Sequence, residues 1–283
     1  VGMEMGQKDG ILTVIAPLKD TPAARGGILA GDKIIKINDT TSADMSVDKA
    51  VNLIRGEPGT TVTLTLAREG LLEPKVVALV RAKISIPTVE TERRADKGVF
   101  IIKLYSFSAQ SPALFQNALR EFADSGYTKL VLDLRNNPGG YLDAAVSMAG
   151  WFLPEGTVVV KEIGKDESDV VLHKSRGPGI FKDKIQMVVL VNKGSASASE
   201  ILAGALSEHG AATLMGQQTF GKGSVQELLK LTADTSIKIT IAKWYTPHGV
   251  SISDSGLTPK IKLEPNKDET KDAQLDEAVN YFK

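Results

Sequence analysis

The stretch of sequence that decides the fold reads KLVLDLRNNPGG, from Lys129 to Gly140. Its first half, Lys129–Leu134, is a short apolar run of the kind that forms a fully buried strand. Asn, Pro and Gly then mark a turn at the carboxyl end of that strand, and a helix-like pattern follows from Leu142 to Phe152. A strand, a turn and a helix in this order form the repeating unit of an α/β fold.

The same pattern recurs on both sides of this unit. The expected strands are Val99–Leu104 and Gln186–Val191, and the expected helices run from Pro112 to about Asp124 and from Ser197 to His209. Strands that alternate with helices predict a mostly parallel sheet covered by helices. Two later segments, Val225–Leu231 and Ile237–Trp244, have the pattern of a hairpin added to that sheet.

The N-terminal part of the chain has a different pattern, with short strands and one clear helix. The expected strands are Gly10–Ile15, Lys33–Asn38 and Thr61–Leu66. Ser46 can cap a helix that places Val47, Val51 and Ile54 on one face. We therefore expect a mixed β module over residues 1–83, an irregular linker over 84–97 and an α/β domain over 98–283.

Composition excludes several classes of protein. The 34 basic and 34 acidic residues cancel, so bulk charge predicts no nucleic-acid partner and no anionic membrane surface. The absence of cysteine excludes a thiolate nucleophile, disulfides and a cysteine-ligated metal, and we expect no cofactor and no metal. No apolar run approaches the roughly 20 residues of a membrane helix, so we expect no direct membrane insertion. The chain opens directly on strand-like sequence, so any signal segment is expected upstream of it.

A run of small residues and hydroxyls, GSASASE from Gly194 to Glu200, opens the third helix. Ser197 and Glu200 fit a capping box, which is a structural explanation in its own right. A helix N-terminus also presents free N–H groups to a developing oxyanion, and the nearest to Ser197 is that of Ala198. Ser197 is therefore a candidate nucleophile, and Ser195 and Ser199 are rivals that spacing does not separate.

A serine nucleophile needs a base, and the candidates are the histidines and one lysine. The turn and helix-end positions of His173, His209 and His248 favour structural roles, although a Ser-His-Asp triad stays open. Lys222 is framed by Gly221 and Gly223 in a turn that can approach another element closely. A lysine base must be buried and hydrogen-bonded, and Gln226 could orient its amine.

Three further motifs bear on the candidate site. The pair Gly139-Gly140 ends a strand and can supply a second oxyanion donor. Gly216–Lys222 matches seven positions of a phosphate-binding loop, but Gly223 replaces the required Ser or Thr and no helix follows. Ser46-Val47-Asp48-Lys49 matches a Ser-x-x-Lys pattern but is explained by helix capping.

Taken together, these motifs resemble those of the C-terminal processing peptidases, also called tail-specific proteases. Residues 21–25 (TPAAR) and 31–38 (GDKIIKIN) resemble the signature of PDZ domains in bacterial proteases. The other motifs are DLRNNPGG (133–140), SASASEI (195–201) and TFGKGSVQ (219–226), in the family's order and spacing. The resemblance implies a Clp-protease/crotonase-like α/β core joined to a PDZ domain.

The resemblance also implies roles for individual residues. Ser197 would be the nucleophile, Lys222 the general base and Gln226 the residue that orients it, with an oxyanion hole at Ala198 and Gly139 or Gly140. In the PDZ groove, Gly2 and Met3 would receive a substrate's C-terminal carboxylate, and Val47, Val51 and Ile54 would flank its last, apolar side chain. Members of the family are typically exported to a periplasm, cell envelope or lumen.

The sequence thus predicts a serine endopeptidase whose protein substrates are recruited by apolar C-terminal tails. Two other readings stay open: a PDZ-containing peptide-binding protein with an inactive or gated core, and a non-peptidase acyl enzyme on the same fold. The complete set of catalytic candidates disfavours the first, and the tail-binding module disfavours the second. A homo-oligomer is compatible with the sequence.

Overall fold

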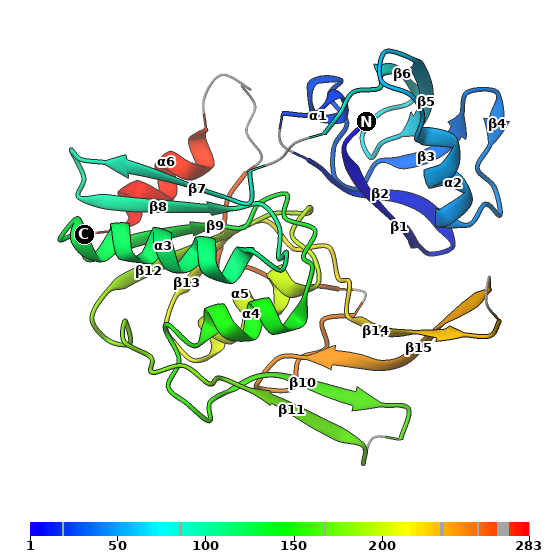
Figure 1. Cartoon of the computed structure of the whole chain (residues 1–283). Coiled ribbons are helices and arrows are strands. Elements are labelled where there is room, and N and C mark those ends of the chain that lie inside the picture. Colours follow the sequence, from blue (N-terminus) through cyan, green and yellow to red (C-terminus); the bar gives the residue numbers. More distant parts are fainter. Residues whose placement is uncertain are drawn as a thin grey trace.

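The chain folds into an N-terminal module (residues 1–84) and a C-terminal core (from residue 87), shown in a computed structural model (Figure 1). The structure describes residues 1–18, 20–84, 87–166, 168–232, 235–253, 255–264 and 272–282. These residues form three sheets, one in the module and two in the core. Within them no helix is long and apolar enough to cross a membrane.

The N-terminal module is a strongly bent antiparallel sheet with two short helices. Its strands are β1 (Met3–Lys8), β2 (Ile11–Pro17), β3 (Lys33–Ile37), β4 (Thr40–Thr41), β5 (Thr61–Ala67) and β6 (Lys75–Val80), and its helices are α1 (Pro22–Arg25) and α2 (Val47–Ile54). The strict alternation predicted for β5 is observed, because Val62, Leu64 and Leu66 are fully buried and the residues between them are not. The module therefore has a hydrophobic core of its own.

The principal sheet of the core has the order β16-β13-β12-β9-β8-β7. Its strands are β7 (Val89–Arg94), β8 (Val99–Leu104), β9 (Lys129–Asp133), β12 (Gln186–Val191), β13 (Thr213–Gly216) and β16 (Ile261–Lys262). All neighbours pair in parallel except β7 with β8. The predicted parallel α/β sheet is confirmed, and β8, β9 and β12 are buried nearly throughout, as their apolar sequences require.

Helices cover both faces of this sheet. One face packs against α3 (Ser111–Asp124), α4 (Leu142–Ala149) and α5 (Ala198–Glu208), and the other against α6 (Ala273–Tyr281). Figure 1 shows α6 on the opposite side of the sheet from α3, α4 and α5. This arrangement leaves the carboxyl ends of the parallel strands, and the loops that follow them, uncovered by helices.

Two expectations about the core are wrong. The linker predicted as irregular over 84–97 contains β7, while residues 85 and 86 lie outside the described residues. β7 is an edge strand whose residues are only half-buried or exposed, so its polar sequence VETERR suits the rim of the sheet. The predicted hairpin does form, but it belongs to a separate sheet rather than to the parallel one.

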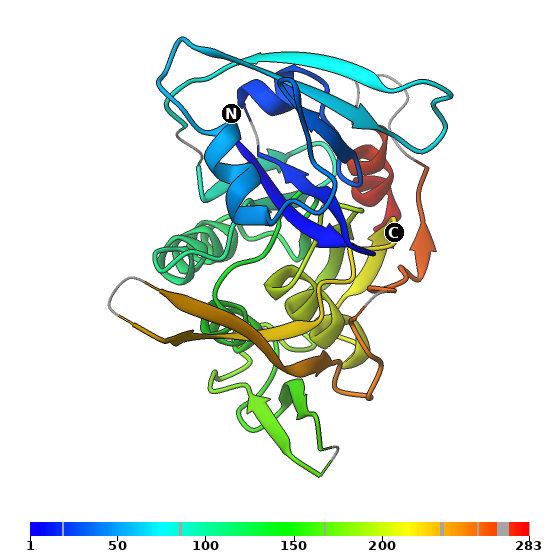
Figure 2. The same ribbon diagram turned by 90° about the vertical axis from the view of Figure 1, so that its right-hand side faces the viewer.

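This second core sheet has the order β11-β10-β15-β14. Its strands are β10 (Val158–Gly164), β11 (Val170–Lys174), β14 (Ser224–Lys230) and β15 (Ser236–Tyr245), all antiparallel. Two views at right angles show the β14–β15 hairpin projecting from the core on the side where the N-terminal module lies (Figures 1 and 2). The hairpin follows directly on the Lys222 turn, so the sheet's position fixes where that turn lies.

Packing of α3 against the sheet provides a test of the core. Phe122 is 1% exposed, and its ring lies 5.6 Å from that of Phe100 and 5.7 Å from that of Phe181. We expect Phe122→Ala to lower the free energy of unfolding by about 3–5 kcal/mol, because it removes buried area and leaves a cavity. Leu114→Ala, at a 38% exposed position of the same helix, should cost less than about 1 kcal/mol.

Urea unfolding followed by tryptophan fluorescence would measure both changes. Trp151 and Trp244 both lie in the core and the chain has no other tryptophan, so the signal reports on the core alone. Equal losses in the two variants would contradict the packing described for α3.

Candidate active site

Ser197 lies at the N-terminus of α5 in a strained backbone conformation. Its φ is +55° and its ψ is −117°, which a non-glycine residue adopts only where the surroundings hold it. Ser197 is half-buried, whereas the neighbouring serines Ser195 and Ser199 are fully buried. The strain turns one serine of the run toward solvent at the end of the helix.

The two rival serines are held by hydrogen bonds. The Ser195 hydroxyl donates to the Leu134 carbonyl (2.8 Å), and the Ser199 hydroxyl donates to the Asn137 carbonyl (2.9 Å). Both bonds fasten the serine loop to the glycine turn that follows β9. The geometry therefore gives Ser195 and Ser199 a structural role and leaves Ser197 as the accessible hydroxyl.

Of the predicted glycine pair, Gly139 packs directly against Ser197 and Gly140 packs against Phe107. A Cβ atom on Gly139 would lie 2.9 Å from the Ala198 nitrogen and 2.5 Å from the Ala196 oxygen, and one on Gly140 would lie 2.2 Å from the Phe107 oxygen. With φ of +97° and +144°, both positions require glycine. The turn thus approaches the start of α5 as closely as backbone can.

Two backbone N–H groups at this point are free within the described part of the chain, those of Ala198 and Gly140. The Gly139 N–H differs, because it donates to the Asn137 side-chain oxygen at 2.9 Å. An incoming oxyanion could therefore be held by Ala198 and Gly140, with Gly139 providing the close approach.

Glu200 connects the serine to the Lys222 turn. It is fully buried, and its carboxylate accepts hydrogen bonds from the Ser197 N–H (2.8 Å), the Lys222 N–H (3.0 Å) and the Gly221 N–H (2.8 Å). A fourth comes from the Thr219 hydroxyl at 2.5 Å. Burial raises the pKa of the Glu200 carboxyl, and the four hydrogen bonds act in the opposite direction. The sequence indicated only the helix-capping half of this role.

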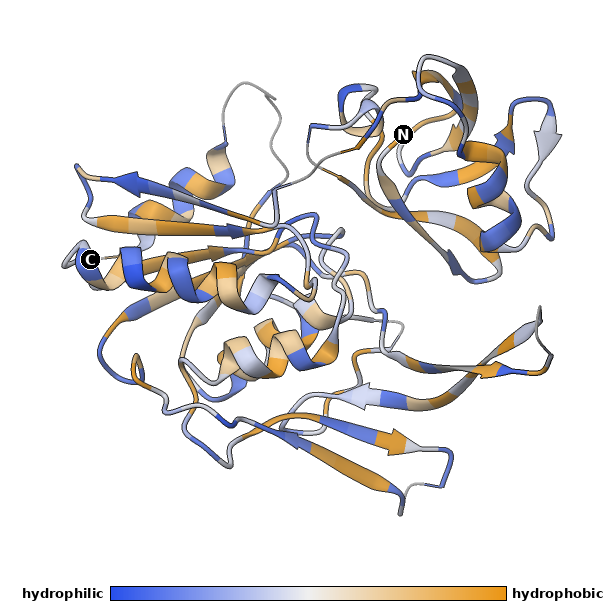
Figure 3. Cartoon of the chain, in the orientation of Figure 1, coloured by the Kyte–Doolittle hydropathy of each residue, from blue (hydrophilic) through white to orange (hydrophobic). Residues whose placement is uncertain are grey.

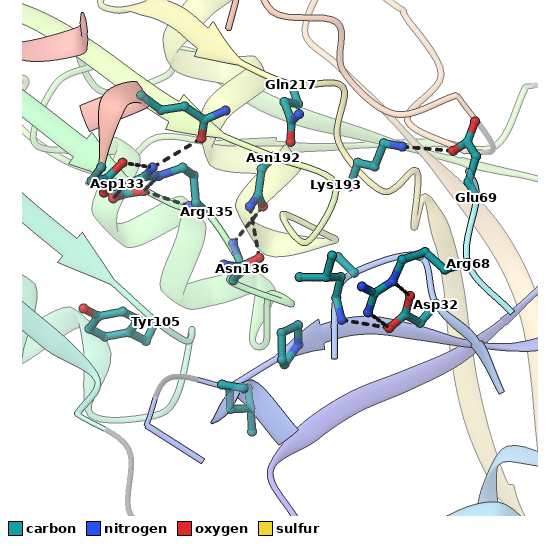
Figure 4. A pocket seen from close by; sticks show the side chains of 18 of the residues that line it. Asp32, Arg68, Glu69, Tyr105, Asp133, Arg135, Asn136, Asn192, Lys193 and Gln217 are labelled. Atoms are coloured by element: carbon teal, nitrogen blue, oxygen red, sulfur yellow. Dashed lines mark hydrogen bonds and ion pairs between the residues drawn. The ribbon is translucent and has the colours of Figure 1, made fainter. Parts of the chain in front are cut away.

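A pair of asparagines joins the turn after β9 to the loop after β12, and Figure 4 shows their two side chains. The Asn136 N–H donates to the Asn192 side-chain oxygen (2.8 Å), and the Asn192 amide donates back to the Asn136 side chain (3.0 Å). Nearby, Arg135 pairs with Asp133 and Asp272, each at 2.6 Å, and so joins the turn after β9 to the start of α6. Single-sequence reasoning missed both contacts because their partners are far apart along the chain.

The Lys222 side chain does not have the surroundings expected of a buried base. It is 38% exposed, and its Nζ lies 3.8 Å from the Glu4 carboxylate on β1 of the N-terminal module. Among the described residues, no hydrogen bond joins Lys222 Nζ to Ser197 or to Gln226, which is exposed on β14. The expectation that Lys222 is buried and held by Gln226 is therefore wrong for this conformation, because Glu4 competes for the amine.

The three histidines have other partners. His173 contacts Glu162 (2.9 Å), His209 caps α5 and contacts the Val158 carbonyl (2.7 Å), and His248 lies 3.8 Å from Glu208. None of these contacts is with a serine of the 195–199 run. The structure offers no Ser-His pair among the residues it describes.

A groove joins the N-terminal module to the Lys222 turn. It has a volume of about 1060 Å³, and it is lined by all five predicted groove residues and by Phe220, Lys222, Ser224 and Gln226 of the core. The five are Gly2, Met3, Val47, Val51 and Ile54. Ile54 is 4% exposed and belongs mainly to the module's core, while Val47 and Val51 are half-buried at the groove surface.

Comparison with family models identifies two regions of the chain. Residues 98–263 match the model of peptidase family S41, and residues 13–68 match a PDZ domain. The first match lies within the core and the second within the N-terminal module described above.

Comparison with individual proteins agrees. A carboxy-terminal-processing protease of Bartonella bacilliformis is 38% identical over 288 aligned positions, which cover 98% of this chain and 65% of the relative. The carboxy-terminal processing protease CtpA of Bacillus subtilis is 36% identical over 264 positions, covering 93% of this chain and 56% of the relative. The chain thus spans between about half and two thirds of these relatives' length.

Among solved structures, the photosystem II D1 C-terminal processing protease superposes with a TM-score of 0.87 at 29% identity, over 99% of this chain and 75% of that one. A Bacteroides fragilis protein described as a putative S41 protease superposes with a TM-score of 0.59 at 17% identity, which shows a shared fold. The predicted fold, a PDZ domain joined to this α/β core, is confirmed by the match to the D1 processing protease.

The Glu200 contacts lead to a prediction. All four groups that reach the carboxylate donate a hydrogen bond, and Thr219 already accepts one from the Leu257 N–H. In Glu200→Gln the side-chain NH2 must face N–H donors, so we expect peptidase activity to fall roughly tenfold to hundredfold and stability to fall by about 2–4 kcal/mol.

Glu155→Gln, in an exposed turn of the same core, is the matched control and should change neither quantity. Activity assays and urea unfolding of both variants would measure the effect. A Glu200→Gln protein with unchanged activity would show that the carboxylate's four bonds do not hold the site together.

Proposed function

The chain belongs to peptidase family S41, and we propose that it is a serine endopeptidase that cleaves protein substrates recruited by their C-terminal tails. The observation that carries the proposal is the position of Ser197, the accessible serine of its run, beside two free N–H groups. Export to a periplasm, cell envelope or lumen stays a prediction.

In the proposed mechanism a neutral Lys222 amine accepts the Ser197 proton as the serine oxygen attacks a peptide carbonyl. The Ala198 and Gly140 N–H groups hold the negatively charged oxygen, which becomes a carbonyl again when the leaving amine takes the proton from Lys222. Water then attacks the acyl-enzyme by the reverse proton path. Gln226 would orient the Lys222 amine once that side chain turns toward Ser197.

Lys222 must leave its partner before it can act as the base. Its Nζ lies 3.8 Å from the Glu4 carboxylate and, among the described residues, makes no hydrogen bond to Ser197. Glu4 lies on β1, and β1 also lines the groove for the substrate tail. The Glu4–Lys222 contact favours a gated core, which was the alternative to a constitutively active peptidase. In this proposal the gated state is the resting state of the same enzyme.

The dyad itself can be tested by cleavage of an unstructured protein with an apolar free C-terminus. We expect Ser197→Ala and Lys222→Ala each to lower the rate by roughly a thousandfold or more, because each removes a group that the chemistry requires. Lys97→Ala, at an exposed turn of the core, should leave the rate unchanged.

If Lys222→Ala retained full activity, another group would be the base and the histidines would have to be considered again. If the unmodified chain cleaved nothing while folded, the binding-protein alternative would be favoured.

The Glu4–Lys222 pair gives a separate prediction. Both side chains are more than a third exposed, 38% for Lys222 and 45% for Glu4, and exposed pairs contribute less than about 1 kcal/mol. Glu4→Gln should therefore raise the rate of cleavage without added tail peptide by roughly two- to fivefold. Glu73→Gln, at an exposed position of the same module, is the control.

Steady-state kinetics of the three proteins would measure this change. An unchanged or lower rate in Glu4→Gln would show that the ion pair does not restrain the base.

A further inference from the structure

The antiparallel sheet of the core ends in an open edge on the side away from the N-terminal module. β11 is the first strand in the order β11-β10-β15-β14, and Figures 1 and 2 show β10 and β11 at the end of the molecule opposite the module. Beyond the β10 ladder, no described backbone group bonds to Val170, Leu172 or Lys174. An edge of this kind is a template for pairing with another chain, and natural proteins usually cover or blunt it.

The side chains of β11 do not blunt this edge. The strand contains no proline, and its three consecutive apolar residues, Val170, Val171 and Leu172, are between 43% and 48% exposed. Because successive side chains of a strand point to opposite faces, β11 exposes apolar groups on both faces of the sheet. Colouring by hydropathy shows apolar stretches along β11 (Figure 3). These features indicate a strand that another strand covers.

Charges of opposite sign flank the apolar row. The turn before it (KDESD, 165–169) has three acidic residues and one lysine, and Lys174 and Arg176 follow it. Asp169, Lys174 and Arg176 are exposed, and in the described part of the chain none of them is in an ion pair. Two copies of β11 aligned in parallel would bring like charges together, whereas antiparallel alignment brings each acidic turn beside a basic end. The charges therefore favour a second copy of β11 as the partner strand.

The ladder with β10 limits how two copies of β11 can pair. Because the Gly164 N–H donates to the Asp169 carbonyl, every second residue from Asp169 faces β10, and Val170 and Leu172 direct their N–H and C=O groups outward. A two-fold arrangement must pair outward residues with outward residues. Centred on Val171, it pairs Val170 of one copy with Leu172 of the other, so every residue of the apolar row lies opposite an apolar residue.

A pair formed in this way is closed and small. Each copy uses its own β11 edge for the other, so no open β11 edge is left for further copies to add to. Each copy contributes a strand of five residues, which is a smaller contact than the roughly 1,200–2,000 Å² of stable interfaces. We therefore expect association in the range of about 10–100 μM rather than an obligate dimer.

We propose that this chain forms a two-fold homodimer in which β11 of one copy pairs antiparallel with β11 of the other, centred on Val171, with the acidic turn of each copy beside Lys174 and Arg176 of the other. The pairing joins two four-stranded sheets into one continuous sheet. Because β11 lies at the end opposite the N-terminal module, the groove of that module stays open in the dimer. The proposal goes beyond the proposed peptidase function and does not depend on it.

Introduced cysteines test the pairing directly, because the chain has no cysteine of its own. In the proposed dimer the two Val171 positions form a pair without hydrogen bonds, whose Cα atoms lie about 4.5 Å apart, within the range that a disulfide spans. Under mild oxidation, Val171→Cys should form a disulfide-linked dimer roughly tenfold faster than Leu114→Cys, at a 38% exposed position of α3. Faster linking in Leu172→Cys than in Val171→Cys would overturn the proposed pairing.

Charge reversal tests the partner's identity. One variant carries Asp166→Lys with Asp169→Lys, and the other carries Lys174→Glu with Arg176→Glu, so each alone places like charges together in a homodimer. At low salt, we expect each variant to associate roughly tenfold more weakly than the unmodified chain, and an equimolar mixture to recover to within about threefold. Sedimentation velocity of the full chain would measure all three.

The remaining outcomes also decide the proposal. If the unmodified chain stays monomeric up to about 500 μM and Val171→Cys links no faster than Leu114→Cys, the proposal is overturned. If the chain dimerises but Val171→Cys does not link, another surface, such as the edge of β14, holds the second copy, and the proposal is again overturned. If a charge variant does not fold, the cysteine series decides alone.

Discussion

The site depends on one buried carboxylate. Glu200 accepts four hydrogen bonds, and these hold the backbone of the candidate nucleophile and the backbone of the candidate base, 25 residues further along the chain, against the same side chain. Burying an ionised carboxylate costs several kcal/mol unless it is fully hydrogen-bonded, so the arrangement is stable only when all its partners are in place. The strained φ of Ser197 is held by the same set of bonds, which explains why a serine can keep a conformation that favours glycine.

Much of this could be predicted from the sequence, and the reason is local. The buried strands β8, β9 and β12 have largely apolar sequences. The two glycines of the Gly139-Gly140 turn after β9 indicate that the backbone of another segment lies close to this turn, as it does in the structure. The helix start at Ser197 and the groove residues of the N-terminal module follow from capping and from spacing on one helix face. Where a structural feature depends on residues close together in the chain, the sequence pattern was sufficient to predict it.

The rest depends on contacts between distant residues. The sequence of β7 predicts a linker, because a polar edge strand has no apolar face that identifies it without its neighbour. The Arg135–Asp272 pair and the Asn136–Asn192 pair join residues 137 and 56 positions apart. The placement of Lys222 near Glu4 depends on how the module sits on the core, which no single segment specifies. The sequence predicted a buried, hydrogen-bonded amine for Lys222, whereas in the structure this side chain is 38% exposed and lies beside Glu4.

The contrast between these two kinds of contact suggests how the site works. The backbones of Ser197 and Lys222 are fixed by a buried carboxylate, whereas the module contacts the site through exposed pairs: Glu4 with Lys222, Lys8 with Phe220 and Lys193 with Glu69. Exposed pairs of this kind are worth less than about 1 kcal/mol each, far less than the buried bonds. A substrate tail bound along β1 could therefore break them at little cost without disturbing the scaffold of the nucleophile. The position of the base is then the part of the site that binding can change, and the position of the nucleophile is the part that it cannot.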